Sequence, residues 1–348
     1  MKISFLNNNY INQNTNAKAN NSKPILNKGL ERDLFVSFAS SQELKSRKPI
    51  MSLSKEFDNS IKVLFPDIDG TIKGFDGKIP ESARKALGRF EDNGLNIIIS
   101  TGRTYTEGKD LYDQLGIKPN YMITQQGAEI VDKTGNIIYQ NSLDPEMARL
   151  AVKAFSEYKK KFSNEDAKMV VYIDGKPYIT EDFKLPYNWE EMIVVDSFTK
   201  LLDDGKIPTK ILFYEPEGDK DDSKRIKELI SYMSERLPDD FHVGHTAKHY
   251  CEITSPEATK GNALKVVLDK MGIDIKNAAA IGDSENDLDM LRVVKNGRGL
   301  SVCMGNGLET AKDAAEFETA HIAQDGFAKA LDAIIQNNKR LSEQKVSV

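Results

Sequence analysis

Hydrophobic and polar residues alternate with two different periods along most of this chain. From residue 61 onward, short apolar runs such as IKVLFPD and LNIIIST take turns with longer stretches such as PESARKALGRFEDNG. The short runs predict buried strands, and the longer stretches have the spacing of amphipathic helices. A chain in which the two kinds of segment alternate is typical of a parallel sheet covered by helices.

The pattern changes after Gly127, where the predicted strands come in pairs around turns, as in AEIVDKTGNIIYQ and KMVVYIDGKPYIT. Paired strands with two long helices between them predict an α+β unit with an antiparallel sheet. The first pattern returns after Ser255. We therefore predict an α/β fold with a Rossmann-like parallel sheet core, formed by residues 61–138 and 247–348, and an inserted α+β cap domain at 139–246.

Residues 1–60 differ from the rest of the chain in composition. This segment contains NNNYINQNTNAKANNSKP and a single short apolar run, LFVSFAS. Asparagine-rich sequence buries too little apolar surface to offset the entropy lost on ordering. We predict a disordered extension that carries no chemistry.

Composition and charge exclude several classes of function. The chain has 348 residues, of which 48 are basic and 53 acidic, so its net charge of −5 gives no field that would attract nucleic acid or anionic lipid. An anionic substrate must then be held by local groups. No apolar run approaches the roughly 20 residues that cross a bilayer, and MKISFLNNNYINQN lacks the apolar segment of a secretory signal. We expect a cytoplasmic protein in which Cys251 and Cys303 are reduced.

Four polar motifs stand where predicted strands end or helices begin, which is the edge where open α/β sheets bind ligands. The first is PDIDGT, in which Asp67 and Asp69 project to the same side of an extended chain and Gly70 allows a turn. Two carboxylates this close repel each other unless a cation lies between or beside them. The spacing therefore predicts a metal site.

The second and third motifs can hold an anion. IIISTGR ends a strand with Thr101 and Gly102, which offer a hydroxyl and backbone N–H groups, and Lys260 opens a helix in TKGNAL. A lysine at a helix N-terminus is disfavoured unless an anion is present. Taken alone, Thr101 and Gly102 are more typical of a helix N-cap, and Lys260 of a solvated surface charge.

The fourth motif, AAAIGDSENDLDM, places Asp283 at a strand end, with Asn286 and Asp287 on the following helical turn. Oxygen ligands of this kind suit Mg²⁺. Alone, the motif also fits an acidic first helical turn, just as Asp67 to Thr71 fits an ordinary turn. The four motifs in this order favour one composite site.

These four motifs resemble those of the haloacid dehalogenase (HAD) superfamily of phosphatases and phosphotransferases. The insertion resembles the large α+β cap of the Cof-type, or subclass IIB, branch of that superfamily. The resemblance covers residues 61 to about 336 and leaves the asparagine-rich extension outside it.

The resemblance implies roles for individual residues. Asp67 is expected to attack phosphorus and form an aspartyl-phosphate, and Asp69 to act as general acid and base. The residues expected to hold phosphate are Ile68, Thr101, Gly102, Lys260 and Asn286. Those expected at a Mg²⁺ ion are Asp67, Asp69 through its main-chain carbonyl, Asp283, and Asp287 behind it.

The implied function is a Mg²⁺-dependent phosphatase that hydrolyses a small phosphorylated metabolite, such as a sugar phosphate or a nucleotide. One alternative is a phosphomutase or phosphotransferase with the same covalent step. Another is a non-catalytic binding protein with a relic site, because Pro66 deletes a backbone donor in a strand predicted to be central. Gln126 is a second departure, since many relatives have asparagine before the glycine.

Two further features of the insertion have open interpretations. His242, His245 and His249 lie close together in the sequence and could bind zinc, but no cysteine or carboxylate completes an obvious set of ligands. Contact with the substrate or plain surface polarity are the alternatives. Trp189 is a candidate for lining the substrate pocket or for packing within the cap.

Overall fold

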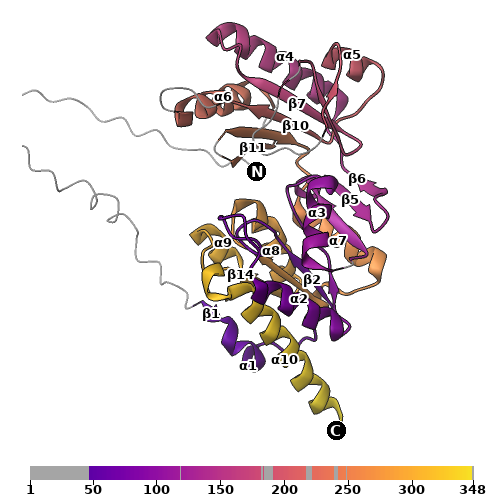
Figure 1. Ribbon diagram of the computed structural model, residues 1–348, viewed down its shortest axis with the longest axis vertical. Coiled ribbons are helices and arrows are strands. Elements are labelled where there is room, and N and C mark those ends of the chain that lie inside the picture. The colour runs from indigo at the N-terminus through magenta and orange to yellow at the C-terminus, as the bar shows by residue number, and fades with distance from the viewer. Residues whose placement is uncertain are drawn as a thin grey trace, which may run out of the picture. The chain divides into compact units, whose positions relative to one another are not determined.

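Three sheets organise this chain in the computed structural model, which describes residues 47–117, 119–181, 183, 191–216, 222–238, 242–247 and 249–346 (Figure 1). The strand order is β1-β15-β14-β13-β2-β3 in the core sheet, β4-β5-β6 in a small sheet, and β11-β12-β10-β7-β8-β9 in the cap sheet.

The core sheet is parallel at every described strand pair. Its strands are β1 (Lys48–Pro49), β2 (Val63–Pro66), β3 (Asn96–Ile97), β13 (Ala278–Gly282), β14 (Leu300–Cys303) and β15 (Phe317–Glu318). Every residue of β2, β13 and β14 is buried, because helices cover both faces of a parallel sheet and leave no polar side. The predicted α/β fold with a Rossmann-like core is confirmed.

Two groups of helices pack on opposite faces of this sheet. Leu64 contributes to the apolar cluster formed with α1, α2, α3 and α10, whereas its neighbours Val63 and Phe65 contribute to the cluster formed with α7, α8 and α9. This alternation follows from the two-residue period of a strand. The helices of the first group are α1 (Leu53–Glu56), α2 (Glu81–Asp92), α3 (Tyr105–Leu115) and α10 (Gly326–Val346). Those of the second are α7 (Lys260–Met271), α8 (Leu288–Asn296) and α9 (Glu309–Ala314).

The small sheet corrects one predicted boundary. Its strands are β4 (Tyr121–Thr124), β5 (Glu129–Asp132) and β6 (Ile137–Gln140), all antiparallel. Because β6 pairs with β5, the first core segment runs to Gln140 and the predicted limit at 138 cuts through a strand. The turn η2 (Gln125–Gly127) joins β4 to β5 with positive φ at all three of its residues, 48°, 60° and 98°.

The cap sheet corrects the other boundary. Its strands are β7 (Lys168–Ile173), β8 (Lys176–Ile179), β9 (Ile193–Val194), β10 (Lys210–Tyr214), β11 (His242–Ala247) and β12 (Tyr250–Thr254). These pair antiparallel except β8 with β9. Since β12 pairs with β10 and buries Cys251 and Ile253 in the cap cluster, the cap extends to Thr254, beyond the predicted limit of 246. The same cluster includes residues of α4 (Pro145–Phe162), α5 (Phe198–Asp203) and α6 (Asp222–Arg236).

The described end of the N-terminal segment is ordered, which corrects the prediction for residues 47–60. β1 pairs in parallel with β15, and Arg47 donates to Glu309 at 2.7 Å and Asp313 at 2.9 Å. Ile50, in η1 (Ile50–Ser52), and Leu53 are buried in the cluster that contains α10 residues. A few apolar residues in KPIMSLSKEF thus bury enough surface to order the segment, whereas residues 1–46 lie outside the described part.

The remaining short 3-10 helices are η3 (Ile275–Asn277), η4 (Glu285–Asp287) and η5 (Ile322–Gln324). Within the described residues, none of the helices combines the length and the apolar character that crossing a membrane requires.

Candidate active site

Three sequence motifs meet at one edge of the core sheet. Asp67 directly follows β2, Asp283 directly follows β13, and Thr101 follows the segment that continues β3. The strands β13, β2 and β3 are neighbours and run in the same direction, so their carboxyl ends lie together. Parallel pairing therefore gathers side chains that are far apart in the sequence.

Three buried carboxylates form the centre of this group. Asp67, Asp283 and Asp287 each offer an oxygen, and these three atoms lie within 4.8 Å of one another. The residues are 4%, 3% and 0% exposed, so water screens their mutual repulsion poorly. A set of oxygen donors with excess negative charge fits a hard cation such as Mg²⁺.

Lys260 neutralises part of that charge. It is the first residue of α7, its side chain is fully buried, and its Nζ donates to Asp67 Oδ1 at 2.6 Å and to Asp287 Oδ1 at 2.7 Å. Burial lowers the pKa of Lys260, but the charges of Asp287 and Asp67 outweigh this effect and raise it above its ordinary value. The lysine therefore stays protonated between two carboxylates.

Asp287 is held rigidly by the protein itself. While Oδ1 accepts from Lys260, Oδ2 accepts the backbone N–H groups of Asp283 at 2.9 Å and Ser284 at 3.1 Å. A side chain at Gly282 would collide with Asp287, which explains why a glycine ends β13. Asp287 thus orients both Lys260 and the backbone of Asp283.

The other two acids are strongly affected by burial. Burial raises the pKa of the Asp67 carboxyl, and the Lys260 ammonium acts in the opposite sense. Burial, together with the charge of Asp287, raises the pKa of Asp283 to about 7, while the hydrogen bond from Thr71 Oγ1, at 2.9 Å from Asp283 Oδ1, lowers it. One lysine does not balance three ionised carboxylates, so the donor set fits a bound divalent cation.

Asp69 is placed differently from the other acids. Its side chain is 50% exposed and is paired with Arg103, whose Nε donates to Oδ2 at 2.9 Å and whose Nη2 donates to Oδ1 at 2.8 Å. Arg103 follows Gly102 in IIISTGR and was not among the predicted site residues. Its position next to a proposed phosphate-binding residue was the only available signal.

The residues expected to hold phosphate are linked through Gln126. Thr101 is buried and its carbonyl accepts the Gln126 N–H at 3.0 Å, while Asn286 Nδ2 donates to Gln126 Oε1 at 3.2 Å. A side chain at Gly102 would collide with the Gln126 amide. Ile68 is buried directly after Asp67. Gln126 therefore forms hydrogen bonds with two of the expected phosphate-binding residues and lies against a third, Gly102.

Pro66 does not interrupt the core sheet. Its carbonyl accepts the Ser100 N–H at 2.9 Å, and the next N–H, that of Asp67, donates to the Ile281 carbonyl at 2.9 Å. Hydrogen bonds therefore continue on both sides of the proline, and Asp67 is fixed by the neighbouring strand.

The predictions for the histidine cluster and for Trp189 in the cap stay open. His249 is buried, whereas Trp189 and the side chains of His242 and His245 lie outside the described residues. The zinc hypothesis stays a hypothesis.

Two proteins named as phosphatases are similar to this chain over most of its length. The chain is 26% identical over 281 residues to the 5-amino-6-(5-phospho-D-ribitylamino)uracil phosphatase YcsE of Bacillus subtilis. The aligned region covers 81% of this chain and 98% of that protein. It is 28% identical over 280 residues to the putative phosphatase YkrA of the same organism, with 78% and 96% covered.

Solved structures and a family model agree with these relatives. A Thermotoga maritima crystal structure matches with a TM-score of 0.64 and 23% identity over 78% of this chain and 97% of that one. A HAD subclass IIB sugar phosphatase matches with a TM-score of 0.61 and 24% identity over 78% and 98%. The model of the haloacid dehalogenase-like hydrolases matches residues 64–331, a span that includes all four motifs. With its motifs gathered at one sheet edge and this match over most of its length, the chain belongs to the haloacid dehalogenase-like hydrolases.

Proposed function

We propose that this protein is a Mg²⁺-dependent phosphatase that acts in the cytoplasm on a small phosphorylated metabolite through a covalent aspartyl-phosphate. The observation that carries the proposal is the contact of Asp67 with Lys260 within a buried group of three carboxylates. A nucleophilic carboxylate beside a phosphate dianion must remain ionised, and it needs nearby positive charge to do so. The names of the two Bacillus subtilis relatives support a phosphatase.

We assign the role of nucleophile to Asp67. Its Oδ1 is held by Lys260, and we assign the attack on phosphorus to the other carboxylate oxygen. The new bond from Asp67 to phosphorus forms as the bond from phosphorus to the leaving oxygen breaks. Asp69 gives its proton to that leaving oxygen, which departs as an alcohol.

Hydrolysis of the intermediate restores the enzyme. Asp69 accepts a proton from water, the water oxygen bonds to phosphorus, and the bond from phosphorus to Asp67 breaks to release phosphate and the free carboxylate. Throughout both steps, Thr101, Gly102 and the Ile68 backbone hold the phosphoryl oxygens in our assignment, with Lys260 as the fixed positive charge. Phosphoryl transfer depends mainly on such positioning and charge stabilisation.

The residues present fit a bound Mg²⁺ ion. Asp67, Asp283 and the Asp69 carbonyl would hold Mg²⁺, and the hydrogen bonds of Asp287 would keep the Asp283 backbone in place. When bound, the ion supplies positive charge that offsets repulsion between the nucleophile and the phosphoryl oxygens. The proposed substrates are phosphate monoesters such as sugar phosphates or nucleotides, in line with the sugar phosphatase among the structural matches.

Phosphate release from a panel of sugar phosphates and nucleotides tests the proposal. We expect turnover with Mg²⁺, loss of turnover with EDTA, and no turnover in Asp67→Asn. Asp332→Asn is the matched control, because Asp332 lies on α10 in a partly exposed pair with Arg89, and it should retain full activity. Hydrolysis by the Asp67 variant would reject the covalent mechanism, and absence of turnover across the panel would favour a binding protein.

A phosphotransferase would use the same residues with a different acceptor. Adding free sugar to the same assay separates the two functions, because a phosphotransferase diverts phosphate from water to the sugar. We expect inorganic phosphate to remain the main product.

A further inference from the structure

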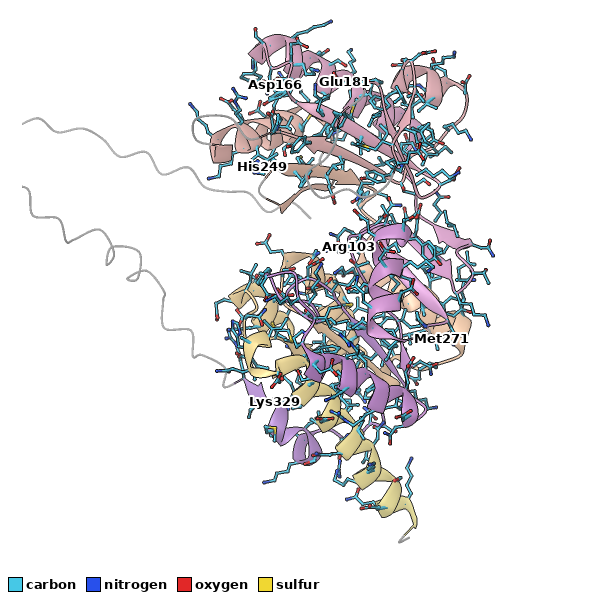
Figure 2. All side chains as sticks on the ribbon, viewed as in Figure 1. Arg103, Asp166, Glu181, His249, Met271 and Lys329 are labelled. Carbon is cyan, nitrogen blue, oxygen red and sulfur yellow. The ribbon has the colours of Figure 1, made fainter. Side chains whose placement is uncertain are left out.

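Arg103 is built into the edge of the proposed site by its backbone as well as its side chain. Its N–H donates to Thr101 Oγ1 at 3.2 Å, and its carbonyl accepts the Gln125 N–H at 2.9 Å. The next residue, Thr104, is the N-cap of α3 and forms a capping box with Glu107. The base of the Arg103 side chain is therefore fixed at the start of α3 (Figure 2).

The side chain of Asp69 needs such a partner. An aspartate that is half exposed can adopt several rotamers, whereas two parallel hydrogen bonds to a guanidinium select one of them. Arg103 is the only partner of this carboxylate among the hydrogen bonds and ion pairs of the described residues. The hydrogen bonds to Asp69 raise the pKa of Arg103, so the guanidinium keeps its charge.

The geometry also limits what Asp69 can do in this arrangement. Both of its oxygens accept from Arg103, Oδ2 from Nε and Oδ1 from Nη2. A general acid must present one protonated oxygen to the leaving group. One of the two hydrogen bonds must therefore open before proton transfer, while the other can keep the carboxyl aligned.

We propose that Arg103 is a positioning residue for departure of the leaving group, an inference that rests on the proposed phosphatase function. With one hydrogen bond retained, Arg103 aligns protonated Asp69 with the leaving oxygen. As the bond from phosphorus to oxygen breaks, the proton moves to that oxygen, and the resulting Asp69 carboxylate again accepts both hydrogen bonds from Arg103. Arg103 itself remains protonated and exchanges no proton.

The leaving group separates this role from general structural support. A sugar alkoxide needs a proton in order to leave, whereas 2,4-dinitrophenolate leaves as a stable anion. Hydrolysis of the intermediate also uses Asp69 and is common to both substrates, so the first step is measured by itself, as leaving-group release in a single turnover. In Arg103→Met we expect this rate to fall about 10- to 100-fold for a sugar phosphate, and to change by less than about threefold for 2,4-dinitrophenyl phosphate because its departure requires no proton. Asp69→Asn should show the same selectivity in this single-turnover rate, and the double variant should be no slower in it than Asp69→Asn alone.

Two variants control for charge and folding. Arg103→Lys keeps the charge with one donor group in place of the planar fork, so it should recover only part of the sugar phosphate activity. Arg89→Met removes a comparable two-pronged pair, in which Nη2 lies 2.7 Å and 2.9 Å from the Asp332 oxygens, and it should leave both activities unchanged. Circular dichroism and the urea midpoint check that each variant is folded.

Three outcomes would overturn the inference. An equal loss of the single-turnover rate on both substrates would assign Arg103 to phosphate binding or to the covalent step, and a rise in KM alone would assign it to substrate binding. Unchanged activity on the sugar phosphate would make the pair an ordinary surface contact. If the wild-type protein hydrolyses neither ester, the proposed function fails as well, whereas wild-type turnover with an unselective Arg103 variant rejects this inference alone.

Discussion

Two lysines are buried among the described residues, and their surroundings differ in one respect. In the cap sheet, the Lys210 side chain is 5% exposed, and its Nζ lies 3.4 Å from Glu252 Oε1 and 4.5 Å from the centre of the Tyr172 ring. In the core, Lys260 is fully buried between two carboxylates, with a third nearby. The cap lysine forms an ion pair with one acid, whereas the core lysine donates to two acids that lie close to a third.

This difference separates a structural ion pair from a functional site. A buried pair with matched charge is roughly neutral for stability, because attraction offsets the loss of hydration. A buried site with more acids than bases destabilises the fold until a cation binds. The three clustered acids in the core are therefore what the proposed cation site requires, and the cap ion pair lacks such a cluster.

The largest expected effect comes from removing the core lysine. Lys260→Met leaves Asp67, Asp283 and Asp287 without their buried positive partner, so we expect phosphate release to fall by about 10³-fold or more. In EDTA the free energy of unfolding should drop by about 3–5 kcal/mol. Phosphate release and urea unfolding measure the two effects. A variant that keeps a tenth of the wild-type rate would remove Lys260 from the proposed mechanism.

A second prediction concerns Asp283. Its replacement should raise the free energy of unfolding in the absence of metal, whereas replacement of Lys260 lowers it. Because burial raises the pKa of Asp283 to about 7, above the roughly 3.9 of an unfolded aspartate, its contribution to stability is complete below pH 4 and is lost as pH rises through 7. Asp283→Asn removes this cost and keeps an acceptor for Thr71. Without metal at pH 8 it should be more stable than wild type by about 2–4 kcal/mol, and equally stable near pH 4.

With magnesium bound, the wild type should become more stable than Asp283→Asn. Ligand binding to the folded state stabilises the wild type, whereas the variant lacks a ligand oxygen and should gain little. Thermal unfolding at pH 8, with Mg²⁺ and with EDTA, gives both comparisons. If EDTA-treated Asp283→Asn is no more stable than wild type, the carboxylates are not in excess and the contrast with the cap pair is lost.

The sequence predicted the parts of this arrangement that depend on local pattern. Buried runs followed by polar residues located Asp67 and Asp283 at strand ends, and parallel order then implied that they meet. The pairing of Asp69 with Arg103 was not predictable, because hydropathy patterns report burial and do not specify which side chains pair. For the same reason the pattern predicted a hairpin at β11 and β12 but did not indicate that β12 pairs with β10. That pairing is why the cap extends to Thr254.

The smallest expected effect is in the cap pair, and it tests the comparison from the other side. Lys210→Met alone leaves the mostly buried Glu252 without its partner, and we expect a loss of about 1–3 kcal/mol in the free energy of unfolding. The double variant Lys210→Met with Glu252→Gln removes both charges and should lie within about 1 kcal/mol of wild type. In both variants kcat for the best substrate should stay within about twofold, because no step of the proposed mechanism uses this pair. Urea unfolding and steady-state rates supply the values. A large loss of kcat in the folded double variant would give the cap lysine a role at the substrate, and matched charge would then no longer distinguish a structural lysine from a functional one.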